Sequence, residues 1–111
     1  MNEIIDLPTF FNKQRDMNQQ ETLRLLQSYG PLFWSWGAHA FIRIGKKALR
    51  MMVSGHHHKG HIYISVNGLD LYDVTLTTAK GKIVETLTDI YCEDLFTIID
   101  NRIERIAEYV R

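Results

Sequence analysis

Cysteine and proline are scarce in this sequence, and it has no long apolar run. Cys92 is the only cysteine among the 111 residues, which excludes an intrachain disulfide and favours a cytoplasmic protein. Two prolines and seven glycines exclude a proline-rich or glycine-rich low-complexity chain. No apolar segment reaches transmembrane length, and residues 1–11 lack the basic start of a signal peptide. We therefore expect one cytoplasmic domain over residues 1–111, with an irregular N-terminal arm over residues 1–16 and no membrane partner.

Acidic residues are absent from a long internal stretch. Although Asp and Glu together number 13, none lies between residues 22 and 69, which carry six Lys and Arg residues and all five histidines. Residues 1–21 have a net charge of −2 and residues 70–111 one of −4, so the whole chain is neutral. This asymmetry predicts a positive and a negative face on the folded molecule. It indicates what kind of partner the protein binds rather than what reaction it performs.

The segment from residue 61 to residue 78 predicts a β-hairpin. Residues 61–66, HIYISV, alternate strictly between apolar and polar side chains, which is typical of a strand with one buried face. Asn67-Gly68 follows, and because both residues tolerate positive φ angles, this pair predicts a two-residue turn. Residues 69–78 are rich in Thr, Leu and Tyr and complete the hairpin as its second strand.

Two more strands are predicted before this hairpin. Residues 38–44 alternate and then turn at residues 45–47 into a further alternating run over residues 49–54. Antiparallel pairing of these runs would bring Arg43 and Arg50 together on the polar side of the sheet.

A fifth strand and two helices complete the expected fold. Residues 82–88 are rich in β-branched side chains and favour a strand. Asn18 is a suitable N-cap for a helix through Ser28, and residues 92–106 place apolar side chains at helical spacing. The fold class is therefore α+β: a five-stranded antiparallel β-meander with an N-terminal and a C-terminal helix packed on one face.

The histidine-rich turn offers the most unusual chemistry in the chain. Neutral imidazole is the commonest ligand of transition metals, so His56, His58 and His61 are candidate ligands of zinc, nickel or copper. Their spacing matches neither a zinc ribbon nor a His-Glu-x-x-His helix, and no carboxylate is near them in the sequence. The alternative is an exposed polar loop, in which case the protein has no cofactor.

The same turn extends a basic surface that we expect to bind a partner. A protein with an acidic surface suits these charges, and the resemblance described below implies that it is a host protein; tryptophans are typical interface anchors. A nucleic acid is an alternative for the same face, although the neutral total charge favours a protein. A homodimer is a further alternative. The expected partner-binding residues are Trp34, Trp36, Arg43, Lys46, Lys47, Arg50, His56, His57, His58, Lys59, His61 and Tyr63.

Few residues suggest catalysis. Cys92 lies between Asp89 and Asp94, and neighbouring carboxylates raise the pKa of a thiol, which opposes its use as a nucleophile. Three consecutive histidines resemble the His-hydrophobe-His motif of rolling-circle nickases, but the middle residue does not match. We therefore expect a protein that is not an enzyme. A metal-dependent or nickase-like enzyme centred on the histidines is the alternative.

Two segments resemble a family of small uncharacterised proteins of phages and other mobile elements. These are residues 54–78, SGHHHKGHIYISVNGLDLYDVTLTT, and residues 83–106, IVETLTDIYCEDLFTIIDNRIERI, within a resemblance that spans Trp36 to Tyr109. The resemblance assigns a role to no residue. It implies an inhibitor or accessory factor that acts by binding, and inhibition of a host defence system is one form of such action.

Overall fold

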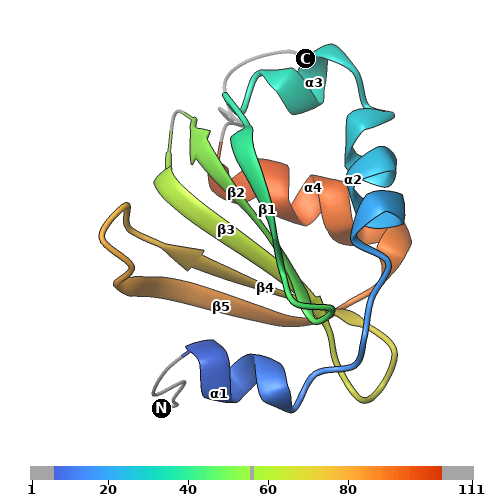
Figure 1. Cartoon of the computed structure of the whole chain (residues 1–111). Helices are drawn as coiled ribbons and strands as arrows, with labels where there is room; N and C mark the ends of the chain where they lie inside the picture. Colours follow the sequence, from blue (N-terminus) through green and yellow to red (C-terminus); the bar gives the residue numbers. More distant parts are fainter. Residues whose placement is uncertain (1–6, 56, 104–111) are drawn as a thin grey trace.

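Five strands form the centre of the computed structural model, which describes residues 7–55 and 57–103. The strands lie side by side in chain order, and each neighbouring pair is antiparallel (Figure 1). The α+β class and the antiparallel meander predicted from the sequence are therefore confirmed. The strands are β1 (His39–Ile44), β2 (Ala48–Ser54), β3 (Lys59–Val66), β4 (Tyr72–Thr77) and β5 (Ile83–Ile90).

Helices lie on both faces of this sheet (Figure 1). The two predicted helices are present as α2 (Gln19–Gln27) and α4 (Cys92–Ile103), and both pack on the same face. A short helix, α3 (Pro31–Trp34), packs beside α2, and a further helix, α1 (Leu7–Asn12), lies on the opposite face. No helix within the described residues is both long and apolar enough to cross a membrane. The expected continuation of α4 to residue 106 lies outside those residues.

Helix α1 corrects part of the prediction of an irregular arm over residues 1–16, of which residues 1–6 lie outside the described residues. Pro8 is compatible with a first helical turn, where its missing N–H would have no intrahelical partner. Phe11 is only 4% exposed, and the centre of its ring lies 5.6 Å from that of Tyr63 on β3. Because a helix of six residues is not stable alone, this tertiary contact stabilises α1, and the local sequence pattern does not reveal it.

Cross-strand pairing divides the strand residues between two faces, since directly opposite residues point to the same side. Leu49, Ile64 and Val74 form one row on the side of α2 and α4, which we call the core face. Arg50, Tyr63 and Thr75 form the adjacent row on the other side, which we call the α1 face. The buried residues that cover the core face are Leu26, Phe33, Trp36, Leu95, Phe96, Ile99 and Ile103.

Asn18 begins α2 as predicted. Its side-chain oxygen accepts a hydrogen bond from the Glu21 backbone N–H at 3.0 Å, which satisfies one of the donors left free in a first helical turn. Gly30 follows with a φ of 60°, and Pro31 then begins α3. The four residues of α3 are too few to show a helical period, so the sequence does not predict this helix.

The connection between β3 and β4 is longer than the predicted two-residue turn. The hairpin is present, but β4 begins at Tyr72 and not at residue 69, and the positive φ of 66° belongs to Asp70. The Asn67 side-chain oxygen accepts hydrogen bonds from the backbone N–H groups of Leu69 and Leu71 at 2.9 and 3.2 Å. Asn67 therefore shapes a longer loop through its side chain, and the prediction of a two-residue turn is wrong.

Candidate protein-binding surface

The residues predicted to form one basic, histidine-rich surface lie in four separate regions of the molecule and in its core. His56 lies outside the described residues. Trp34 and Arg43 lie on α3 and β1; Lys46 and Lys47 lie in the β1–β2 turn; Arg50, His61 and Tyr63 lie on the α1 face; His57, His58 and Lys59 lie at the β2–β3 turn; Trp36 lies in the core.

Trp36 does not belong to any surface, which corrects its assignment as a partner-binding residue. Its side chain is 0% exposed and stacks on Phe96 of α4, with ring centres 4.8 Å apart. The indole Nε1–H donates a hydrogen bond to Asp100 Oδ1 at 2.9 Å, so its polar atom is satisfied inside the protein. Trp36 therefore links the segment before β1 to α4 and stabilises the fold.

Arg43 and Arg50 lie on opposite faces of the sheet and not together as predicted. The three-residue turn between β1 and β2 pairs Ile44 with Ala48, so Arg43 is opposite Leu49 on the core face. Arg50 is opposite Ile42 on the α1 face. A shift of one residue in register moves every side chain to the other face, and the sequence alone does not determine this register.

The basic residues at the two ends of β2 also remain apart. Lys46 and Lys47 precede this strand, whereas Lys59 pairs with Ser54 at its far end. Seven residues of β-strand span about 20 Å. The Lys47 ammonium donates a hydrogen bond to the backbone oxygen of Gln14 at 2.7 Å and lies 3.3 Å from Asp16, so its charge is partly compensated.

The histidine-rich turn lies against the end of α4. The His57 backbone N–H donates a hydrogen bond to the Ile103 carbonyl oxygen at 2.6 Å, and the Gly55 N–H donates one to the His58 carbonyl oxygen at 3.0 Å. Within residues 7–55 and 57–103, no group of three or more His, Cys, Asp or Glu side chains is placed to hold a metal ion. The proposed metal ligands His56, His58 and His61 include one residue outside that part of the chain.

The α1 face brings together Arg50, His61 and Tyr63. His61 is next to Arg50 and Tyr63 on this face, and the ring centres of His61 and Tyr63 are 6.2 Å apart. Burial and the charge of Arg50 lower the pKa of His61, and a hydrogen bond with the Ala79 backbone partly opposes both effects. His61 is therefore a neutral side chain at pH 7, beside a permanent positive charge.

A buried polar cluster on the same face was missed by the sequence analysis. The two carboxylate oxygens of Asp73 accept hydrogen bonds from Gln14 Nε2 at 2.9 Å, Asn67 Nδ2 at 2.9 Å and the Asp89 N–H at 3.1 Å. Gln14 Nε2 also donates to Ser65 Oγ at 2.8 Å. These bonds fix the β3–β4 loop and the chain after α1 to the sheet. Only the register of three strands brings the residues together, so no sequence motif predicts them.

Exposed apolar side chains lie on α3 and β1, and of these only Trp34 belongs to the predicted site. Trp34 is 52% exposed, and Ile42, on the outermost strand, is 41% exposed. Phe33 joins the two elements, because its ring contacts those of Trp34 and Phe41 at centre distances of 4.8 and 6.4 Å. We call this region, which consists of Leu32, Trp34, Phe41, Ile42 and Arg43, the α3–β1 surface.

Arg43 lies between two hollows at this edge of the sheet. One, of about 180 Å³, is lined by Leu23, Phe41 and Arg43 among others. The other, of about 420 Å³, is more open and reaches from Arg43 to Asp16 and Met17 before α2. An extended segment laid along β1 would therefore meet an apolar recess with a guanidinium group at its border.

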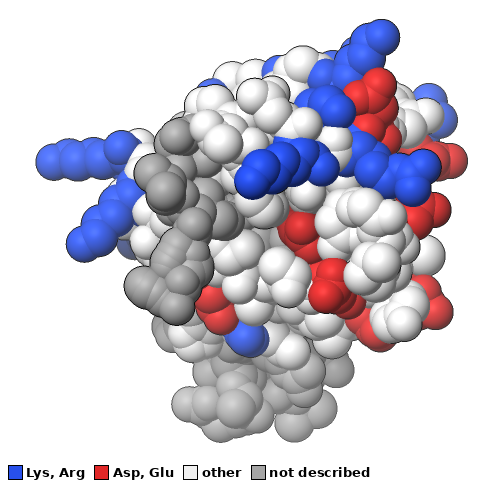
Figure 2. Space-filling view, turned by 90° about the horizontal axis from the view of Figure 1, so that it is seen from below, with Lys and Arg blue, Asp and Glu red and all other residues white. Residues whose placement is uncertain are grey.

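Figure 2 shows how positive and negative side chains are distributed on one side of the molecule, where a separation into two faces was expected. On the side that it shows, Lys and Arg side chains project at the left and over the upper part, and Asp and Glu side chains lie at the centre and the right. At the upper right, the two signs of charge lie next to each other. This side of the molecule is mixed in charge and is not a single positive face.

Comparison with known proteins found no relative of this chain. No protein-family model matches the chain, and neither a curated protein nor a solved structure shows significant similarity to it.

Proposed function

We propose that this chain is a non-catalytic binding protein whose α3–β1 surface binds an acidic segment of a partner protein. The observation that carries this proposal is the exposure of Trp34 on α3 and of Ile42 and Arg43 on β1, the outermost strand of the sheet. Single exposed apolar residues are common, but exposed aromatic and aliphatic side chains beside an arginine are typical of the centre of a protein interface.

The charge of this surface favours an acidic partner. Neither α3 nor β1 contains Asp or Glu, and Arg43 is exposed. Lys46 follows β1 at the next turn and is also exposed. Complementary charge speeds the encounter with an acidic surface and disfavours basic partners.

The outer edge of β1 adds backbone groups to this surface. In the described part of the chain, β1 pairs only with β2, so its other edge has N–H and C=O groups available for an extended peptide. A register shift between His39 and Ile42, with a φ of 55° at Ala40, interrupts the first half of the strand. An added strand is therefore expected to pair with residues 42–44.

Binding rather than catalysis is also favoured by the one thiol. Cys92 is exposed, and its hydrogen bond to the carboxylate of Glu93 raises the pKa of the thiol. A raised pKa reduces the thiolate fraction and opposes nucleophilic catalysis. Because the sequence resembles mobile-element proteins, we take the partner to be a host protein. Inhibition of a host defence system is one expected outcome of binding.

The test is affinity capture from nuclease-treated host lysate with four versions of the chain. We expect wild type and Lys82→Glu, a charge reversal in the β4–β5 turn, to retain the same partner protein. Arg43→Glu and Trp34→Ala should lower its affinity about tenfold or more, because residues of these types dominate interface energies. Equal retention by all four versions would contradict the proposal. Capture that is lost on nuclease treatment would instead support the nucleic-acid alternative.

A further inference from the structure

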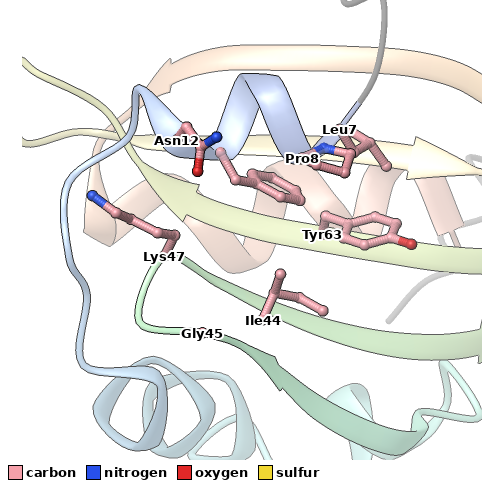
Figure 3. Close-up of a pocket in the computed structure, with 8 residues that line it drawn as sticks. Leu7, Pro8, Asn12, Ile44, Gly45, Lys47 and Tyr63 are labelled. Carbon is pink, nitrogen blue, oxygen red and sulfur yellow. The ribbon is translucent and has the colours of Figure 1, made fainter.

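A cleft lies on the α1 face, on the opposite side of the sheet from α2, α3 and α4. It has a volume of about 440 Å³ and is enclosed between α1 and strands β1 to β3 (Figure 3). This volume lies in the range of small-molecule sites. Its main lining residues are Leu7, Pro8 and Phe11 from α1, and Ile44, Lys47 and Tyr63 from the sheet and its turn.

The cleft is an apolar trough with a polar group at each end. Figure 3 shows Leu7 and Pro8 above the trough and Ile44 below it. The Lys47 side chain is at one end, and the Tyr63 hydroxyl points out at the other end. Because the two ends differ in polarity, the orientation of a bound molecule would depend on which polar group near the cleft lacks a partner.

Arg50 does not itself line the cleft, but it lies next to Tyr63, which does. Arg50 is the direct cross-strand neighbour of Tyr63 and of Ile42, and it is one row from Ile44 along the α1 face. Three side-chain nitrogens of the described residues are buried and have no hydrogen-bond partner: Arg50 Nε and His61 Nδ1 on the α1 face, and His58 Nε2 at the β2–β3 turn. The ammonium of Lys47, by contrast, is already bonded to Gln14 and paired with Asp16.

A buried donor without a partner costs free energy, and the cost is larger when the group is charged. Arg50 has the planar set of N–H donors that matches a carboxylate, and none of its cross-strand neighbours on the α1 face is acidic. An anion beside the guanidinium group would supply an acceptor for its N–H donors. The apolar lining next to it would hold the rest of the same molecule.

We propose that this cleft binds a small amphipathic carboxylate, with its apolar body beneath α1 and its carboxylate on Arg50. A compact polyanion such as a nucleotide phosphate suits the site less well, because most of the lining is apolar and the one cation in it, Lys47, is already bonded to Gln14 and paired with Asp16. Arg43 lies on the other face of the sheet from the cleft, whereas Ile42 shares the α1 face with Arg50, so substitutions of Arg43 separate this site from the proposed protein-binding surface.

His61 provides an independent signal of binding. The charge of Arg50 contributes to the lowered pKa of His61, and Arg50 and Tyr63 are the titratable or charged groups beside it on the α1 face. An anion on Arg50 would offset that charge and raise the pKa of His61 towards its ordinary value. A ligand held only by apolar contacts would leave this contribution of Arg50 in place.

Decanoate, used below its micelle concentration, is a suitable probe, and decanol is its uncharged match. Isothermal titration of the full chain should show saturable binding of one decanoate, with decanol at least tenfold weaker. Arg50→Gln should lower the affinity for decanoate about tenfold or more, because it removes a charge-assisted hydrogen bond. Arg43→Gln, on the opposite face, is the matched control and should not change it.

Three results would overturn the proposal. Decanol that binds as tightly as decanoate would show an apolar cleft without an anion site. Arg50→Gln that folds normally by thermal unfolding and keeps full affinity would place the carboxylate elsewhere. Binding that occurs only after removal of residues 1–6, which include Glu3 and Asp6, would mean that the full chain does not take up the ligand.

The two proposals fail separately. If Arg43→Glu loses the captured protein but binds decanoate normally, the α3–β1 surface and the cleft are distinct sites. Loss of decanoate binding in Arg50→Gln with normal protein capture would also show that the two sites are distinct. A chain that captures no protein but binds decanoate through Arg50 would leave the cleft proposal standing alone.

Discussion

On the core face of the sheet, Leu49, Ile64 and Val74 form a row that the helices bury completely or almost so. On the α1 face, the adjacent row consists of Arg50, Tyr63 and Thr75. The backbone is the same in both cases, and only the alternation of side chains separates the two rows. The core face supplies the continuous apolar surface that stabilises the fold. The α1 face is partly covered by one six-residue helix and keeps buried donors without partners.

This difference indicates a division of roles within one sheet. Natural proteins retain groups that do not favour stability where function needs them. Arg50 and the cleft beside it fit that description, whereas the Asp73 cluster on the same face has all its carboxylate oxygens bonded. We expect mutations on the core face to affect folding, and mutations at Arg50 to affect binding.

Replacement of Ile99 by Asp should have the largest effect. Ile99 is 1% exposed and lies on the side of α4 that packs against the core face, so the variant buries a charge without a partner. We expect a loss of about 4 kcal/mol or more in the free energy of unfolding, measured by urea denaturation. Ile42→Asp, at a position that is 41% exposed, is the matched control and should cost about 1 kcal/mol or less. Equal effects of the two changes would contradict the assignment of the core.

Replacement of Asn67 by Ala should have an intermediate effect. The Asn67 side chain accepts hydrogen bonds from two backbone N–H groups of the β3–β4 loop and donates to Asp73 and Asp89. We expect a loss of about 1–3 kcal/mol in urea denaturation. Gly68→Ala should change stability by less than about 0.5 kcal/mol, because no atom lies within 4 Å of the added carbon. A two-residue Asn-Gly turn would predict the opposite order, with Gly68 as the sensitive position.

Replacement of Arg50 by Met should leave the stability nearly unchanged or raise it. Met preserves much of the side-chain volume and removes a charged group whose buried Nε has no hydrogen-bond partner. We expect a change within about 1 kcal/mol in the free energy of unfolding, on the stabilising side. A loss of more than about 2 kcal/mol would show that Arg50 stabilises the fold, which would contradict the division of roles between the two faces.

The smallest expected effect concerns the pH dependence through His61. Burial, followed by the charge of Arg50, lowers the pKa of His61 in the folded chain, so the unfolded chain takes up this proton at a higher pH. The contribution of His61 to stability is therefore present above the ordinary histidine pKa and is lost as the pH falls through that value towards the lower folded pKa. In Arg50→Gln, NMR titration should show a higher His61 pKa and a smaller loss in acid. An unchanged pKa would mean that burial alone causes the shift.

Local signals in the sequence predicted much of this fold. The alternation of residues 61–66 gives β3, Asn18 caps α2, and the spacing of Leu95, Phe96 and Ile99 gives the buried side of α4. These features depend on neighbouring residues along the chain, and the sequence shows them directly.

Most of the errors concern long-range contacts; the exception is the β3–β4 loop, where local hydrogen bonds from Leu69 and Leu71 to the Asn67 side chain replace the predicted two-residue turn. Helix α1 depends on the contact of Phe11 with Tyr63, and the burial of Trp36 depends on Asp100 of α4. The separation of Arg43 from Arg50 follows from a one-residue difference in register. For the same reason the sequence identified Arg50, His61 and Tyr63 as candidate residues but not the cleft beside them, since that cleft exists only where α1 lies across the sheet.

The most direct test of the division between the two faces is methyl NMR of isoleucine-labelled protein during a decanoate titration. Ile44 lines the cleft on the α1 face, and Ile64, on β3, is 0% exposed on the core face. We expect the Ile44 methyl signal to shift with saturation while the Ile64 signal stays in place, and Arg50→Gln to abolish the shift at the same ligand concentration. Equal shifts of both signals, or no shift of Ile44 at saturating ligand, would contradict the account.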